Sequence, residues 1–255
     1  MSKGHFVWHD LMTTDTAAAL TFYQGLLGWT TEVQDMGSGP YTMVKAADKS
    51  FGGVNQDDTG SPRWISYISV ENLDDSVAKI KELGGSVHET LAVPGVGTMA
   101  YATDPDGAEF APFQDENADY QHELPHGVQP GGGIAWHELT ANDQNKADAF
   151  YSEIFGWGKV VWPMDDGGEY HGLTIGEIPV AGVFKRPEQV PYCYWSIYFE
   201  APGTVEQTVT DVKRLGGSVL RDTFTVEGTG DIAIVKDPAG AVFGLMKSLP
   251  MENAQ

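Results

Sequence analysis

The feature that most constrains the fold of this 255-residue chain is an internal duplication. The segment Trp8-His9-Asp10-Leu11 returns 128 positions later as Trp136-His137-Glu138-Leu139. A repeat in constant register indicates two copies of one structural unit. The same spacing relates Asp15 to Asp143, Ala19 to Ala147, Phe22-Tyr23 to Phe150-Tyr151, and Gly28-Trp29 to Gly156-Trp157.

Later parts of the repeat drift in spacing, as insertions in loops would cause. Leu83-Gly84-Gly85-Ser86-Val87 returns as Leu215-Gly216-Gly217-Ser218-Val219. The polar segment 117–131 contains Pro125 and Pro130 and predicts a linker. We therefore expect a first domain over residues 1–116, a second over 132–250, and a tail over 251–255.

Within each half, the pattern predicts two modules of one strand, one helix and three strands. Residues 6–12 alternate as a strand does, and Asp15 then caps a helix whose apolar face includes Ala19 and Phe22. Gly28 ends that helix. The cycle restarts with a strand at 65–70 and a helix at 73–83. We predict an α+β fold of four βαβββ modules, paired into two open, curved sheets with helices on the convex side.

Composition excludes several functions. Fifteen Lys and Arg against 36 Asp and Glu give a formal charge of -21, which repels nucleic acid and anionic membranes. No apolar stretch approaches the ~20 residues of a membrane span. Cys193 is the only cysteine, so no intrachain disulfide can form. Without a signal-peptide pattern at the N-terminus, this predicts a cytoplasmic protein.

Two motifs resemble a known superfamily. The run Asp15…Phe22-Tyr23…Leu27-Gly28-Trp29 is similar to its D-x(6)-F-Y-x(3)-L-G-[FW] segment. Segments 104–107 and 237–240 are similar to its D-P-x-G turn before the last strand. The chain thus resembles the vicinal oxygen chelate superfamily, which includes glyoxalase I, bleomycin-resistance proteins and extradiol dioxygenases. The resemblance covers both halves and is that of a tandem, two-domain glyoxalase-like protein.

The resemblance implies a divalent metal held by His, Gln or Glu at three strand positions in each half. None of the side chains at those positions suits a metal: an indole has no lone pair to offer, and the others are apolar, absent or phenolic. We therefore expect no cofactor and no metal at the usual positions. These positions are Trp8, Ile65 and Ala111 in the first half, and Trp136, Tyr194 and Gly244 in the second.

His9 and His137 are weaker alternatives as metal ligands, because each is one residue away from a ligand position. Strand alternation points them toward the helix layer if Trp8 and Asp10 face the concave side. A slip of one residue in register would reverse this assignment. Packed structural histidines and ligand or acid–base histidines both remain open.

The concave face is predicted to offer aromatic walls and a carboxylate in each half. Asp10 and Glu138, beside indoles, are candidate general bases; the competing interpretation is that each only hydrogen-bonds backbone or a neighbouring tyrosine. Small residues at Ala111 and Gly244 are expected to leave room for a ligand. Further ligand-binding candidates are Trp8, Trp136, Tyr67, Tyr194, Tyr198, Glu109, Phe113 and Met246.

Three functions are compatible with these residues. The favoured one is a metal-independent protein that binds a small aromatic or cationic metabolite in the concave pocket. The alternative is a lyase, isomerase or hydroxylase that uses a pocket carboxylate or a relocated divalent metal. A third is an interaction or stress protein with a vestigial pocket. No nucleic acid or membrane partner is expected, and the duplication leaves both a monomer and a homodimer open.

Overall fold

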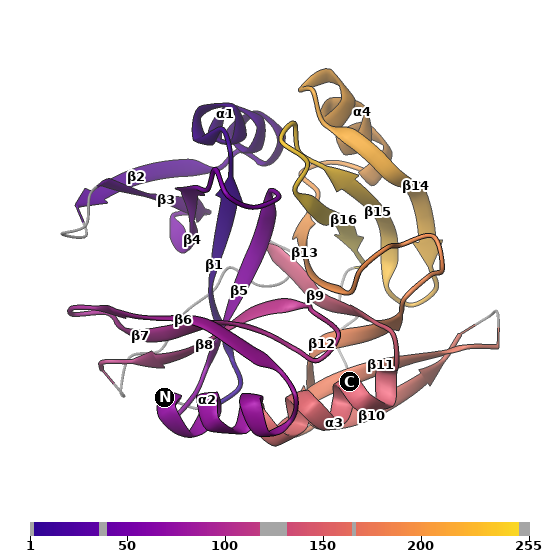
Figure 1. Cartoon of the computed structure of the whole chain (residues 1–255). Helices are drawn as coiled ribbons and strands as arrows, with labels where there is room; N and C mark the ends of the chain where they lie inside the picture. The colour runs from indigo at the N-terminus through magenta and orange to yellow at the C-terminus, as the bar shows by residue number, and fades with distance from the viewer. Residues whose placement is uncertain (1–2, 36–39, 118–131, 165–166, 250–255) are drawn as a thin grey trace. The chain divides into compact units, whose positions relative to one another are not determined.

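A computed structural model describes residues 3–35, 40–117, 132–164 and 167–249 (Figure 1). The predicted linker beyond Asn117 and the predicted tail lie outside these residues. The elements are β1 (Phe6–Thr13), α1 (Thr16–Leu27), β2 (Thr30–Asp35), β3 (Pro40–Ala46), β4 (Lys49–Gln56), β5 (Arg63–Ser69), α2 (Leu73–Glu82), β6 (Ser86–Val93), β7 (Gly97–Thr103), β8 (Glu109–Asp115), β9 (Ile134–Ala141), α3 (Gln144–Phe155), β10 (Gly158–Pro163), β11 (Glu169–Ile175), β12 (Ile178–Lys185), β13 (Tyr194–Glu200), α4 (Val205–Arg214), β14 (Ser218–Val226), β15 (Gly230–Lys236) and β16 (Val242–Ser248).

These elements form four βαβββ modules and two eight-stranded mixed sheets. The strand orders are β2-β3-β4-β1-β5-β8-β7-β6 and β10-β11-β12-β9-β13-β16-β15-β14. In every module the first strand pairs in parallel with the last, and the strands that follow the helix pair antiparallel. The predicted α+β class and module order are confirmed.

The repeated helix signals act as predicted. Asp15 caps α1 by accepting a hydrogen bond from the backbone N–H of Ala18, and Gly28 ends the helix at φ 72°. Asp143 caps α3 in the same way, and Gly156 also has φ 72°. A left-handed residue after the helix favours glycine, because glycine has no Cβ to clash with the backbone.

Packing divides the chain into two compact units that differ from its two sequence halves. The α2–α3 unit comprises the described parts of 1–8, 65–122 and 136–196, and the α1–α4 unit comprises those of 9–64, 123–135 and 197–255. Helices α1 and α4 pack together in one unit, and α2 and α3 do so in the other (Figure 1). Each core therefore joins a module of the first half to a module of the second.

A buried chain of polar side chains links the modules of the α2–α3 unit. The indole Nε1 of Trp195 donates to Tyr151 Oη over 2.8 Å, and Tyr151 Oη donates to Asp104 Oδ2 over 3.0 Å. The other Asp104 oxygen accepts backbone N–H groups of Asp106 and Ala108 within its own turn. The D-P-x-G turn of one half is thus hydrogen-bonded to the α3 tyrosine of the other.

The α1–α4 unit repeats this Trp–Tyr–Asp relay. Trp64 Nε1 donates to Tyr23 Oη over 3.1 Å, and Tyr23 Oη donates to Asp237 Oδ2 over 3.4 Å. Burial, and next the charge of the aspartate, raise the pKa of both relay tyrosines, Tyr23 and Tyr151, well above the usual phenol value. Both phenols therefore stay protonated and act as donors to the carboxylates.

A second pair of equivalent contacts involves the tryptophans after α1 and α3. Trp29 Nε1 donates to the carbonyl of Gly132, and Trp157 Nε1 donates to the carbonyl of Gly4, each over 2.8 Å. Both tryptophans are 3% exposed, in agreement with their equivalent positions after the two helices. Each hydrogen bond links the residue after a helix to the chain segment just before the first strand of the other half.

Removing one relay phenol should destabilise the protein. We expect Tyr151→Phe to lower the free energy of unfolding by about 1–3 kcal/mol, because it leaves the buried Trp195 N–H and the Asp104 oxygen without their partner. Chemical denaturation measures the change. Tyr192→Phe is the control, since Tyr192 is 55% exposed and should change the value by no more than ~0.5 kcal/mol. Equal effects of the two substitutions would contradict the role of the relay.

Candidate functional site

The sheet face that points away from the helices can be identified at β11. His171 Nδ1 lies 2.7 Å from Asp148 Oδ2 of α3, so His171 points toward the helix layer. Side chains alternate along a strand, so the next residue, Gly172, belongs to the opposite, helix-free face. Gly172 pairs with Gly182, and Gly182 pairs with Glu138, which places Glu138 on the helix-free face as well.

Glu138 is the centre of a hydrogen-bonded group on this face. Tyr170 Oη donates to Glu138 Oε2 over 2.9 Å, and Trp136 Nε1 donates to Tyr170 Oη over 2.8 Å. Burial, and next the charge of Glu138, raise the pKa of Tyr170 well above its usual value. The phenol therefore stays neutral and presents its proton to the carboxylate.

Tyr194 of β13 belongs to the same group. Its hydroxyl forms hydrogen bonds with the side chains of Ser196 and Thr140, and burial raises its pKa, with Glu138 adding a second, electrostatic contribution. We call Trp136, Glu138, Tyr170 and Tyr194 the Glu138 cluster. It combines one carboxylate with three aromatic rings, an arrangement that suits cations and hydrogen-bond donors on planar molecules.

A glycine on the strand between them makes the Tyr170–Glu138 contact geometrically feasible. Tyr170 extends from β11 across β12 to reach Glu138 on β9, and its ring occupies the space beside Gly182. A Cβ placed on Gly182 would lie 1.8 Å from Tyr170 Oη. Sequence reasoning missed Tyr170, although a glycine inside a strand is the kind of signal that marks a close approach.

The first half contains an equivalent pair. Tyr41 Oη donates to Asp10 Oδ1 over 2.5 Å, and the Tyr41 ring lies beside Gly53, where a Cβ would be 2.0 Å from the hydroxyl. Asp10 is 5% exposed. Both candidate carboxylates, Asp10 and Glu138, are thus hydrogen-bonded to a tyrosine, as the competing interpretation of the sequence proposed. A role as general base stays a prediction.

The other predicted ligand-binding residues differ in how far they are buried. Tyr67 is 2% exposed, its hydroxyl lies 2.9 Å from that of Tyr101, and its ring meets Phe113 edge-on. Phe113 and Met246 are buried, whereas Trp8 and Glu109 are half-buried.

Gly244 does not leave the open space expected from the sequence. A Cβ built on this glycine would lie 2.0 Å from Cδ1 of Tyr198, so the tyrosine ring already fills the position. Tyr198 and Gly244 pair across β13 and β16, and Tyr198 is only 4% exposed. The expectation of room at Gly244 was wrong, because an adjacent strand supplies a large side chain.

The two matched histidines are buried. His9 is 0% exposed, and His137 is 2% exposed with its ring stacked on Phe6 at a centroid distance of 3.7 Å. His137 lies one residue before Glu138, so it points toward the helix side of β9. The structure does not bring His137 into the Glu138 cluster.

The resemblance implies a divalent metal, and the residues at its usual positions in the second half do not fit one. Trp136 uses its only polar atom as a hydrogen-bond donor, and the Tyr198 ring covers Gly244. Tyr194 is a protonated phenol with a raised pKa. Across the described ranges, no three His, Cys, Asp or Glu side chains converge to hold a metal ion.

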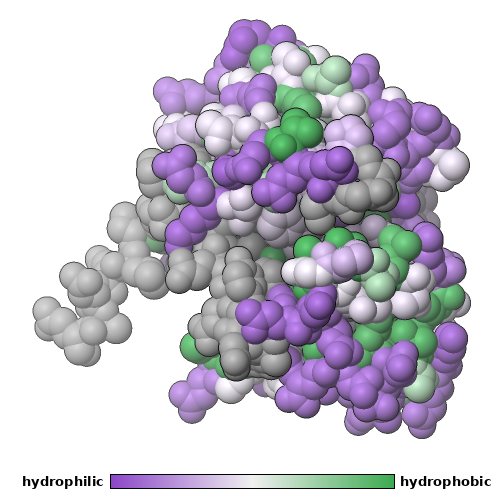
Figure 2. All heavy atoms as spheres, turned by 90° about the vertical axis from the view of Figure 1, so that its left-hand side faces the viewer, coloured by the Kyte–Doolittle hydropathy of each residue, from purple (hydrophilic) through white to green (hydrophobic). Residues whose placement is uncertain are grey.

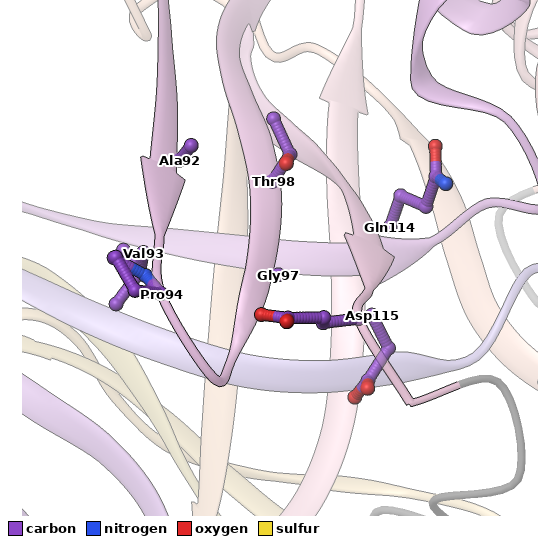
Figure 3. Close-up of a pocket in the computed structure, with 8 residues that line it drawn as sticks. Ala92, Val93, Pro94, Gly97, Thr98, Gln114 and Asp115 are labelled. Atoms are coloured by element: carbon purple, nitrogen blue, oxygen red, sulfur yellow. The ribbon is translucent and has the colours of Figure 1, made fainter.

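Two cavities lined by described residues lie away from the Glu138 cluster. One, of about 330 Å³, borders the β6–β7 hairpin and the end of β8 (Figure 3). Its polar side chains serve local structure: Gln114 Oε1 accepts the N–H of Leu73 at the start of α2, and Glu116 accepts that of Gly95. The other, of about 730 Å³, follows the end of α1 in the α1–α4 unit. No residue of the Glu138 cluster lines either cavity.

The face of the molecule drawn in Figure 2 is largely hydrophilic. Figure 2 shows a face on which hydrophilic residues cover most of the coloured area and hydrophobic residues lie in small separate groups. None of the helices in the described ranges has the length and apolar character needed to cross a bilayer.

Comparison with known proteins identifies the family. A model described as a glyoxalase-like domain matches residues 7–112. The chain is 31% identical over 283 residues to the anthracycline biosynthesis protein DauV of Streptomyces sp. (strain C5), covering 96% of this chain and 94% of DauV. It is 28% identical over 253 residues to CFP32 of Mycobacterium tuberculosis, covering 96% and 95%.

Solved structures share the fold. The Mn(II)-bound glyoxalase of Novosphingobium aromaticivorans aligns with a TM-score of 0.66 at 15% identity, over 100% of this chain and 87% of that one. The 2,3-dioxygenase LapB of Pseudomonas sp. KL28 aligns with a TM-score of 0.66 at 14% identity, over 100% and 96%. The sequence relatives and the fold place this chain among the tandem proteins of the vicinal oxygen chelate superfamily. Within it, the chain belongs to the glyoxalase-like proteins.

The close approach at Gly182 can be tested by adding one methyl group. We expect Gly182→Ala to lower the free energy of unfolding by about 1–3 kcal/mol, because the Tyr170 ring must leave Glu138 to make room. Tyr170→Leu in the same chain should recover part of the loss, since it removes the obstructing ring. Denaturation of both single variants and the double variant measures this coupling. Strictly additive effects would show that the ring does not occupy this space.

Gly25→Ala is a matched control for adding a methyl group. Its Cβ would meet only the side chain of Leu215, at 3.3 Å, and Gly25 lies inside α1, where alanine is favoured over glycine. The contact is tight but meets only the end of a flexible side chain, so we expect this substitution to change the free energy of unfolding by less than Gly182→Ala does.

Proposed function

We propose that this protein binds a small aromatic or cationic molecule on the helix-free face of β9–β12, without a metal at the family's usual positions. The observation that carries the proposal is the Glu138 cluster, in which a half-buried carboxylate is bordered by an indole and two phenols. A carboxylate in such partly dry surroundings attracts a cation more strongly than one in water does. Aromatic rings beside it add stacking or cation–π attraction of roughly 0.5–2 kcal/mol each.

The name of one relative supports a planar ligand. The name of DauV places that protein in anthracycline biosynthesis, and anthracyclines are polycyclic aromatic compounds. The alignment covers nearly the whole of both chains. A flat ligand also suits the three rings of the Glu138 cluster.

A second candidate function is acid–base catalysis at the same carboxylate. The Tyr170–Glu138 hydrogen bond favours it, because a phenol beside the carboxylate supplies the partner that the sequence did not reveal. Glu138 would accept a proton from the substrate, and Tyr170 would hold the carboxylate in position. Liquid chromatography with mass spectrometry of the recovered ligand separates the two: simple binding returns it unchanged, whereas a lyase changes its mass and an isomerase changes its retention time.

Binding of 9-aminoacridine, a planar cation, tests the favoured function. Fluorescence titration should show saturable binding to the wild type and an affinity about tenfold lower or more for Glu138→Gln, because a charge-assisted contact of about 1.5 kcal/mol or more is lost.

Glu177→Gln is the matched control. It removes the same charge from an exposed position in the β11–β12 turn, so it reports only the general attraction of an acidic protein for a cation. If both variants weaken binding equally, or if the wild type does not bind, the proposed function is wrong.

A further inference from the structure

Beyond the Glu138 cluster, aromatic side chains continue outward to the edge of the same sheet face. Trp162 of β10 pairs across the strands with Tyr170 of β11, so the two side chains share a face. Their rings stack with a centroid distance of 6.1 Å and an interplanar angle of 27°. Tyr170 in turn approaches Phe184 of β12 at 6.5 Å.

Two glycines leave the space in which these rings pack against the sheet surface. A Cβ on Gly172 would be 2.4 Å from the Trp162 ring, and one on Gly182 would be 1.8 Å from Tyr170 Oη. Each ring therefore occupies the space beside the next strand's glycine. The Trp162 ring reaches toward Tyr170, and the Tyr170 hydroxyl reaches Glu138.

The outermost ring remains accessible. Trp162 is 37% exposed, so part of its ring can be reached from solvent. The first half lacks this extension. There Gln34 pairs with Tyr41 as Trp162 pairs with Tyr170, and Met43 pairs with Gly53 as Gly172 pairs with Gly182. The continuation to the edge strand is thus a property of the second half alone.

The length of this surface limits its ligand. It spans four adjacent strands, β10 to β9, which at the usual strand spacing corresponds to about 14 Å. A single aromatic ring at Glu138 would leave Trp162 untouched, whereas several fused rings can cover both.

We propose that Trp162, Tyr170 and Phe184, laid over Gly172 and Gly182, form a stacking shelf that selects flat ligands of several fused rings, with a cationic or donor edge at Glu138. This inference rests on the proposed function, because it requires ligand binding at Glu138. Trp162 determines specificity for ligand length; Glu138 anchors the ligand's polar edge.

A homologous series of cations tests the shelf. The compounds 4-aminopyridine, 4-aminoquinoline and 9-aminoacridine have one, two and three rings with the same amino-substituted edge, and all are protonated at neutral pH. In calorimetric titrations we expect wild-type affinity to rise with ring number. Trp162→Leu, which keeps an apolar side chain but removes the flat ring, should weaken 9-aminoacridine at least fivefold and leave 4-aminopyridine unchanged.

Two further variants control for effects on folding and exposed apolar surface. Trp162→Phe keeps a smaller ring and should restore part of the 9-aminoacridine affinity. Ile178→Ala removes an apolar side chain that is 70% exposed in the same unit and should change no affinity. Thermal unfolding of each variant checks that the fold is intact. If Trp162→Leu does not fold, the 9-aminoacridine affinity of Trp162→Phe relative to the wild type tests the shelf instead.

The outcomes separate this inference from the proposed function. If Glu138→Gln weakens 9-aminoacridine but the Trp162 variants do not, the shelf is wrong and the proposed function stands. If the Trp162 variants weaken all three compounds equally, selection by ring number is wrong. If none of the compounds binds, the proposed function is wrong, and the shelf with it.

Discussion

The structure depends on a tryptophan–tyrosine–aspartate relay that occurs once in each packing unit. In the α2–α3 unit, Tyr151 receives a hydrogen bond from Trp195 and donates one to Asp104. The side chains of the relay are buried, so leaving one of their polar groups unpaired would cost more than the hydrogen bond itself contributes. Because helix and turn come from different sequence halves, the relay makes the fold of each half depend on the other.

A similar series of hydrogen bonds, from a tryptophan to a tyrosine to a carboxylate, lies on the opposite sheet face. There Trp136 donates to Tyr170, and Tyr170 donates to Glu138, in a half-buried group. The buried relays stabilise the packing of helices against turns. On the helix-free face the carboxylate and the aromatic rings beside it remain partly exposed.

Much of the fold could be read from the residues. The caps at Asp15 and Gly28, and the alternation of the strands, predict the four modules correctly, because these signals are local. The carboxylate Glu138 was also identified by alternation. Tyr170 was missed, because its contact with Glu138 crosses an intervening strand and depends on the pairing register. Gly244 was misjudged for the same reason: the ring that fills its space belongs to a neighbouring strand.

The sequence by itself determined the duplication, the order of elements, and the unsuitability of residues such as Trp8 and Trp136 as metal ligands, since side-chain chemistry and local periodicity require no tertiary information. Only the tertiary structure decided which modules share a core and which tyrosine meets which carboxylate. Those contacts join residues distant along the chain, and their geometry follows from strand register and from the space that glycines such as Gly182 leave open.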